Sequence, residues 1–206
     1  MPEHAEAPLA AAAPPEAPAS WPCAEEAYGF RIGEWRLVQA DLREPEAVVA
    51  ALAAAGMDPA LPTLVISECV LVYMAAEESA AVVEAVGGAL HEALWVTYDM
   101  YNPDDTFGRV MLRNLRPSFI PGMVAYPTLA SHERRFLDRG WGQARSASMR
   151  SAYERLVPAS EHRRVARVEM LDELEQWHLL MEHYCLTLAC KGHACEAVLA
   201  ELAPGA

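Results

Sequence analysis

The chain has 206 residues, of which 53% are apolar, and it carries a formal net charge of −13. This length and apolar content suffice for one domain with a substantial core, and the negative charge disfavours nucleic acid and anionic membranes as partners. No window of about 18 uncharged apolar residues predicts a membrane span.

The first 27 residues are dominated by Ala, Pro and Glu. Such a composition buries too little apolar surface to offset the entropy lost on ordering, so we expect a flexible arm over residues 1–27. The acidic start and the interrupted apolar stretch are unlike a secretory signal. We therefore expect a cytoplasmic location.

Strands and helices are predicted in alternation over residues 35–101. Alternating side chains predict a strand over 35–40, and Pro45 and Gly56 delimit a helix that follows it. The apolar run "LPTLVISECVLVYM" from Leu61 to Met74 predicts a strand that is buried on both faces and ends near Glu68. This alternation is typical of an α/β fold with a parallel sheet.

A helix over 77–90 and a strand over 94–101 continue this part of the chain. The residues of that helix that should face the core are Val82, Val83, Val86 and Leu90. Beyond Asn102 we expect helices over 102–116, 129–140, 151–156 and 171–184, a Pro-broken loop over 117–128, and strands over 141–149 and 185–192.

Glu68 is the residue that most needs an explanation in this pattern. An unpaired ionised carboxylate is costly to bury, so either the strand ends at Glu68 or a partner meets it. Ligands of open parallel sheets bind beyond the carboxyl ends of the strands. The candidates at these ends are Asp41, Leu42, Glu68, Cys69, Tyr98 and Asp99. If the first two strands are neighbours, Asp41 and Glu68 line one crevice.

Less specific interpretations compete with these assignments. Asp41 is also suited to cap the helix that begins at Pro45, and Asp99 suits a surface turn. Ser67 and Cys69 flank Glu68, but the G-x-S-x-G elbow of nucleophilic hydrolases is missing, as are the glycine-rich phosphate loops.

The five cysteines contain no C-x-x-C pair, so we expect reduced thiols and no metal site. A site formed by Cys190, His193 and Cys195 is a weaker alternative, because their spacing matches no common zinc pattern.

Four segments carry a resemblance to a known family. "YGFRIGEWRLVQADLRE", "LPTLVISECVLVYM", "TFGRVMLRNLR" and "HYCLTLACKG" closely resemble the leucine carboxyl methyltransferases, in that family's order. This family methylates the C-terminal leucine of the protein phosphatase 2A catalytic subunit. The resemblance implies a class I, Rossmann-like methyltransferase sheet over residues 28–192, with a helical insertion but without its first strands, followed by a tail over 193–206.

The resemblance also implies roles for four residues and a cofactor, S-adenosylmethionine. The Asp41 carboxylate would receive the adenine amino group, and the Leu42 backbone would meet the ring. Glu68 resembles the acid at the cofactor and reaction centre, and Tyr73 lines the pocket for the leucine carboxylate. We assign no catalytic residue, because a C-terminal carboxylate, with a pKa of about 3.3 to 3.7, is already a nucleophile at neutral pH.

The family's N-terminal portion, with its glycine-rich loop, has no counterpart in this chain. Because the first strand of such a sheet pairs with the fourth, we expect Leu64 to Ile66 to form an unpaired apolar edge. We expect the chain as given to bind S-adenosylmethionine weakly or not at all. The alternative to an enzyme is a non-catalytic remnant that binds the phosphatase through residues 102–127, and a small-molecule methyltransferase is a weaker third option.

Overall fold

The computed structural model describes residues 29–32, 35–192 and 199. The chain divides into two units, residues up to Gln39 and residues from Ala40 onward. In the first unit, β1 (Gly29–Ile32) and β2 (Trp35–Val38) pair as an antiparallel hairpin. The predicted arm over 1–27 lies outside the described residues, as does the predicted tail except for Leu199.

The strand expected over 35–40 exists, but its expected membership of the parallel sheet is wrong. β2 pairs with β1, whereas the main sheet has the order β3-β4-β6-β5. Only two residues separate β1 from β2 in the sequence, so closing the hairpin costs little loop entropy. Alternation along a strand does not reveal which neighbour it pairs with, and the sequence reasoning therefore missed this partner.

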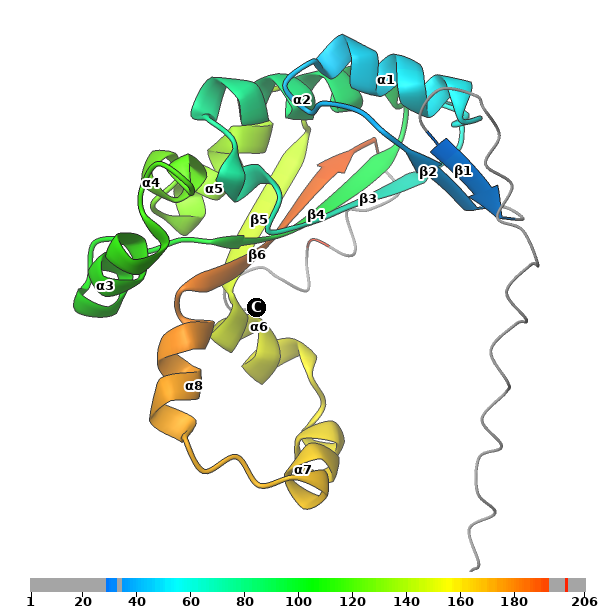
Figure 1. Ribbon diagram of the computed structural model, residues 1–206. Coiled ribbons are helices and arrows are strands. Elements are labelled where there is room, and N and C mark those ends of the chain that lie inside the picture. The colour runs from blue at the N-terminus through cyan, green and yellow to red at the C-terminus, as the bar shows by residue number, and fades with distance from the viewer. Residues whose placement is uncertain (1–28, 33–34, 193–198, 200–206) are drawn as a thin grey trace, which may run out of the picture. The chain divides into compact units, whose positions relative to one another are not determined.

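The main sheet, shown in Figure 1, is mixed. β3 (Thr63–Glu68) runs parallel to β4 (Ala93–Met100), and α2 (Ala76–Ala89) connects them. β6 (Tyr184–Lys191) is antiparallel to both β4 and β5 (Gln143–Ser148). The predicted α/β class is confirmed.

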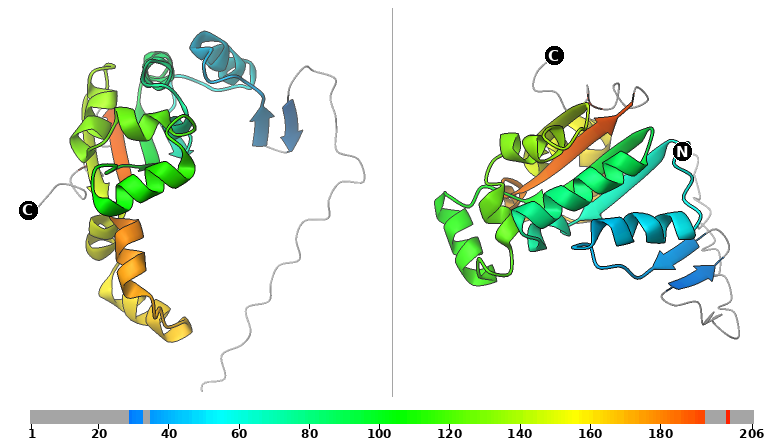
Figure 2. Two further views of the ribbon diagram at one scale, coloured as in Figure 1. Left: turned by 60° about the vertical axis from the view of Figure 1, so that its left-hand side comes forward. Right: turned by 90° about the horizontal axis from the view of Figure 1, so that it is seen from above.

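Three helices, α1 (Pro45–Ala54), α2 and α5 (Leu129–Leu137), lie on one face of this sheet, which we call the covered face (Figures 1 and 2). Pro45 occupies the first turn of α1, and Gly56 follows that helix with a φ of 94°, as the sequence predicts. The α2 residues predicted to face the core are all buried: Val82, Val83, Val86 and Leu90.

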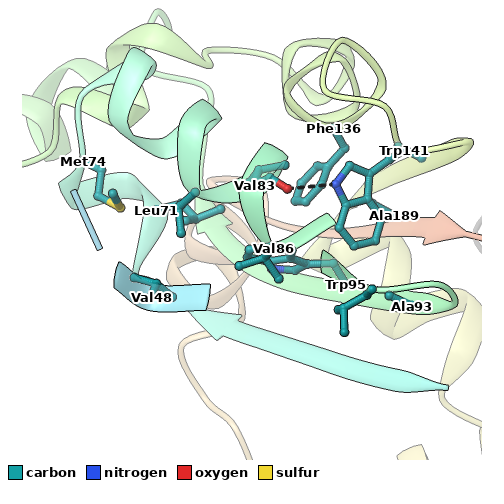
Figure 3. Close-up of a cluster of buried hydrophobic side chains, with 13 residues drawn as sticks. Val48, Leu71, Met74, Val83, Val86, Ala93, Trp95, Phe136, Trp141 and Ala189 are labelled. Carbon is teal, nitrogen blue, oxygen red and sulfur yellow. Dashed lines mark hydrogen bonds between the residues drawn. The ribbon is translucent and has the colours of Figure 1, made fainter. Parts of the chain in front are cut away.

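The core beneath these helices centres on three aromatic rings (Figure 3). Trp95 of β4, Phe136 of α5 and Trp141 meet edge to face, with ring centroids 5.5 to 5.8 Å apart. The Trp141 Nε1 donates a hydrogen bond of 3.2 Å to the backbone oxygen of Val83. The rings thereby join β4, α2 and α5 into one apolar cluster.

The opposite face of the sheet, which we call the open face, is less covered at β3. Leu64 and Ile66 are 58% and 69% exposed, so the expectation that β3 is buried on both faces is wrong. The expected apolar edge is confirmed within the described part of the chain, where β3 pairs with β4 and with no other strand. Over β5 and β6, Leu199 covers this same face and packs against Ala147 and Leu188.

The remaining helices surround the ends of the strands. They are the 3₁₀ helix η1 (Leu71–Tyr73), α3 (Thr106–Leu115), α4 (Pro121–Ala125), α6 (Met149–Leu156), α7 (Ala159–Val168) and α8 (Leu174–Met181). The sequence reasoning missed α4 and α7. α7 has the sequence ASEHRRVARV and buries no residue, as does α8, which was predicted.

The oxidation state of the cysteines differs from the expectation at one position. Cys69 and Cys185 are free thiols, but Cys190 is disulfide-bonded, so the reduced state predicted for all five cysteines is wrong there. Spacing along a chain does not show which thiols the fold brings together. Among the described residues, no helix combines the length and apolar character that crossing a membrane requires.

Candidate functional site

Asp41 lies in the loop that enters α1, where its carboxylate is engaged by a neighbouring arginine. The Arg43 guanidinium donates to Asp41 from Nε at 2.9 Å and from Nη2 at 2.6 Å. These hydrogen bonds lower the pKa of Asp41 to about 2. The interpretation of Asp41 as the cap of α1 is wrong, because Glu44 occupies the N-cap position and makes no side-chain cap.

Leu42 follows Asp41 and is half-buried, with its side chain packed against the core of the covered face. The core contact of Leu42 fixes this loop beside α1. The loop can therefore present the Asp41 carboxylate and the Leu42 backbone from a defined position.

Glu68 is the last residue of β3 and is exposed. Its carboxylate stays in water, so no desolvation cost arises, and the expectation that the strand ends at Glu68 is confirmed. Cys69 next to it adopts a φ of 47°, which turns the chain into η1. The Cys69 amide donates to the Tyr98 backbone oxygen at 2.8 Å, so the turn remains attached to β4.

Tyr98 stands directly opposite Glu68 in the pairing of β3 with β4. The Tyr98 ring stacks on Tyr184, the first residue of β6, with centroids 5.0 Å apart. Tyr73, on η1, is 57% exposed and lies near enough to Tyr184 to affect its pKa. The structure therefore brings together Glu68, Tyr73, Tyr98 and Tyr184 at the carboxyl ends of β3 and β4.

Asp99 lies on the covered face, so its interpretation as a surface turn residue is wrong. Its Oδ2 accepts a hydrogen bond of 3.0 Å from the Arg135 Nη1, and both side chains are completely buried. Burial raises the pKa of Asp99, and the charge of Arg135 opposes that shift. Successive residues of a strand face opposite sides, so Asp99 cannot share the environment of Tyr98.

The two candidate nucleophiles beside Glu68 are unsuited to that role. The Ser67 hydroxyl is buried and accepts a hydrogen bond of 2.9 Å from the Trp95 Nε1, which is a structural contact. Burial raises the pKa of the Cys69 thiol to about 11, so it is protonated at neutral pH.

A hydrogen-bonded pair that the sequence reasoning missed positions α3. Asp105 caps this helix by accepting from the Gly108 amide at 2.7 Å, and its Oδ1 lies 2.9 Å from the His183 Nε2. His183 is buried, and its Nδ1 lies 2.6 Å from the Leu179 backbone oxygen. The pair ties α3, α8 and the start of β6 together next to the tyrosines. A sequence signal was available, since Asp is a favoured N-cap residue, but the helix was predicted to begin at residue 102, before Asp105.

The arrangement of the other predicted residues is less direct. Arg43, which holds Asp41, also interacts electrostatically with Glu78 in the first turn of α2. No contact joins Asp41 to Glu68 among the described residues. β2 does not pair with β3 there, so the condition on which a shared crevice was expected is not met. Within the same residues, no group of three or more His, Cys, Asp or Glu could hold a metal ion. His193 and Cys195 lie outside them.

Residues 24–87 match the sequence model of a family described as leucine carboxyl methyltransferase. A leucine carboxyl methyltransferase 1 homolog of Arabidopsis thaliana is 40% identical over 157 residues, which are 75% of this chain and 47% of the relative. Leucine carboxyl methyltransferase 1 of Bos taurus is 38% identical over 160 residues, 77% of this chain and 48% of the relative.

Similarity also extends to a protein with a different name. The tRNA wybutosine-synthesizing protein 4 of Rattus norvegicus is 37% identical over 165 residues, 79% of this chain and 24% of the relative. The chain spans about half the length of the leucine carboxyl methyltransferases described above.

Proposed function

We propose, from the premise that the chain belongs to the leucine carboxyl methyltransferase family, that it serves methyl ester formation on a protein C-terminal leucine. The proposed substrate is the C-terminal tail of the protein phosphatase 2A catalytic subunit. The proposed cofactor is S-adenosylmethionine, bound by a Rossmann-like sheet, and the proposed location is the cytoplasm.

One observation carries this proposal. Glu68, within the segment that matches the family, is an exposed carboxylate at the carboxyl end of a parallel strand, where α/β sheets bind ligands. It has no hydrogen-bond partner among the described residues. It is therefore available to a cofactor that carries a positive charge.

The residues proposed to hold the cofactor fit it in part. The Asp41 carboxylate accepts four hydrogen bonds from Arg43, from the backbone amide and Nε at Oδ1 and from Nε and Nη2 at Oδ2. A carboxylate offers about four lone-pair sites, so an adenine amino group can bind Asp41 only if the exposed Arg43 side chain moves. S-adenosylmethionine, when bound, supplies an activated methyl group.

The acceptor side of the reaction needs orientation more than acid–base chemistry. The substrate carboxylate is ionised at neutral pH and is the nucleophile without a general base. The exposed Tyr73 hydroxyl is a donor that can hold one carboxylate oxygen while the other points to the methyl group. Holding the reacting atoms in line lowers the activation free energy by several kcal/mol, on the order of 7 kcal/mol in favourable cases.

A second candidate is the non-catalytic phosphatase-binding remnant. The observation that favours it is a set of exposed apolar residues on and around α3 and α4: Val110, Leu115, Phe119 and Val124. Exposed apolar groups of this kind occur at protein interaction sites. A role on tRNA, which the name of one relative implies for that relative, is disfavoured by the net charge of −13.

The test measures methyl ester formation on a peptide that ends in a free leucine carboxylate, with labelled S-adenosylmethionine and the purified chain. Because we expect the chain as given to bind S-adenosylmethionine weakly at best, the cofactor is supplied in large excess. We then expect slow labelling of the ester, none on the same peptide with an amidated end, and loss of the reaction in Glu68→Gln. Glu84→Gln, an exposed acid of α2 paired with Arg139, is the matched control. Peptide binding without methyl transfer supports the remnant. A chain that neither binds nor methylates the peptide contradicts both candidates.

A further inference from the structure

Tyr98 and Tyr184 form a stacked pair of aromatic rings at the end of the sheet, which we call the tyrosine ledge. Their rings stack with centroids 5.0 Å apart and an interplanar angle of 11°. Both side chains are half-buried, so one part of each ring packs on the protein while another part meets solvent. Because the rings are stacked, each covers part of one face of the other, and the parts that remain for a ligand are the outer ring faces and the ring edges.

The register of the sheet places this ledge on the open face. Tyr98 pairs with Glu68 of β3, and Tyr184 pairs with Met100 of β4, so all four residues project to the same side. The helices α1, α2 and α5 pack on the covered face, where Thr97 and Asp99 project (Figures 1 and 2). The ledge therefore lies on the same side of the sheet as the exposed Glu68 carboxylate.

The ledge is bordered by an apolar cluster, by the Glu68 carboxylate and by the Asp105–His183 pair. Burial raises the pKa of Tyr98 to about 12, and it also raises the pKa of Tyr184, so both hydroxyls remain protonated at neutral pH. Tyr184 also touches a buried apolar cluster that contains Val72, Met100 and Ile120. Among the described residues, neither tyrosine hydroxyl has a hydrogen-bond partner, so both can donate to an acceptor.

We propose that the tyrosine ledge binds the apolar side chain of the acceptor's C-terminal residue and thereby sets the preference for leucine. The branched leucine side chain packs against the uncovered edges and the outer face of the stacked ring pair, and a tyrosine hydroxyl donates to the terminal carboxylate. This inference rests on the proposed function, since it names the residues that recognise the proposed acceptor. Tyr98 and Tyr184 are specificity residues, and neither takes part in a covalent step.

The experiment measures how the chain distinguishes peptides that differ only at the last residue. Fluorescently labelled hexapeptides ending in leucine, in alanine, or in leucine amide are titrated with the purified chain, and anisotropy gives each Kd. We expect the wild-type chain to bind the leucine peptide about tenfold more tightly than the alanine peptide, since added methyl groups in an apolar site contribute effects of this order.

Two kinds of variant separate the ring from the hydroxyl. Tyr98→Leu and Tyr184→Leu remove the aromatic faces, and we expect the leucine-to-alanine ratio to fall to about threefold or less. Tyr98→Phe and Tyr184→Phe keep the faces, so the ratio should be retained while the preference for a free carboxylate over the amide decreases. Tyr153→Leu is the matched control, because Tyr153 is also half-buried and stacked, on His162 in α7.

The outcomes distinguish this inference from the proposed function. Near-UV circular dichroism first establishes that each variant is folded. One outcome is that the wild-type chain and the variants Tyr98→Leu and Tyr184→Leu all bind the leucine peptide more tightly than the alanine peptide by the same factor. That result contradicts the proposed role of the ledge and leaves the proposed function standing. If the wild-type chain binds none of the peptides, the protein-substrate part of the proposed function is overturned together with the ledge.

Discussion

The two faces of the main sheet differ in what their side chains contact. On the covered face, Trp95, Phe136 and Trp141 are at most 4% exposed and pack under helices α1, α2 and α5. On the open face, Leu64 and Ile66 are more than half exposed although they belong to the same strand as the buried Ser67. Stability therefore depends mainly on the covered face, whereas Glu68, Tyr98 and Tyr184 of the candidate site project to the open one.

The largest difference between the faces should appear when one apolar side chain is truncated on each. Phe136→Ala removes a completely buried ring from contact with two tryptophans, and we expect a loss of about 3–5 kcal/mol in the free energy of unfolding. Ile66→Ala, at 69% exposure, should cost less than about 1 kcal/mol. Denaturant titration of both variants measures this, and similar losses would contradict the comparison.

The buried Asp99–Arg135 pair tests whether polar groups on the covered face stabilise the fold. Arg135→Met leaves the Asp99 carboxylate buried without its partner, so we expect a loss of about 3–5 kcal/mol. The double variant Asp99→Leu, Arg135→Met should recover most of this, because no buried charge remains.

Three atoms of this pair already lack hydrogen-bond partners within the described part of the chain, namely Asp99 Oδ1 and Arg135 Nε and Nη2. A pair that is incompletely satisfied is easier to replace by apolar groups. A double-mutant cycle by denaturant titration gives the coupling energy. Additive losses in the double variant would show that the two charges do not depend on each other.

Two adjacent glycines of α2 offer a matched pair on the two sides of one helix. A Cβ on Gly87 would lie 2.8 Å from the Trp141 Nε1, whose ring is held in the core, so Gly87→Ala should cost about 1–3 kcal/mol. A Cβ on Gly88 meets nothing within 4 Å. Gly88→Ala should therefore stabilise by up to about 1 kcal/mol through helix propensity. Thermal unfolding of both variants checks the opposite signs.

His132 on the covered face should make stability depend on pH. Burial lowers the pKa of His132 to about 3, below its ordinary value of 6.5. Below pH 6.5 the unfolded chain binds a proton that the native state does not, so this stability is present above 6.5 and is lost as the pH falls toward 3. We expect a loss of about 1 kcal/mol between pH 6.5 and 5.5. In His132→Gln, this part of the dependence of the free energy of unfolding on pH should disappear.

Individual residues show how far sequence reasoning reached at the site. Glu68 was found because an acid within an apolar run needs an explanation, and its place at the end of β3 is confirmed. Tyr73 was identified through the family resemblance alone. Tyr184 and His183 were missed, because nothing in the last strand indicates that it begins beside Met100, more than 80 residues earlier in the chain.

The sequence by itself determined the elements whose signals are local. Pro45 and Gly56 delimit α1, the spacing of Val82, Val83 and Val86 identifies the buried side of α2, and Glu68 ends β3. These signals depend on backbone preferences and on periods of 3.6 or 2 residues, which a single segment expresses without any partner.

Only the tertiary structure decided which strands pair and which face the helices cover. Alternation requires Tyr98 and Asp99 to face opposite sides, but it does not say which side is buried. That choice follows from where α5 and β6 return to the sheet, bringing Arg135 to Asp99 and Tyr184 to Tyr98. Such contacts join residues far apart in the chain, so their free energy depends on the whole fold and leaves no local pattern in the sequence.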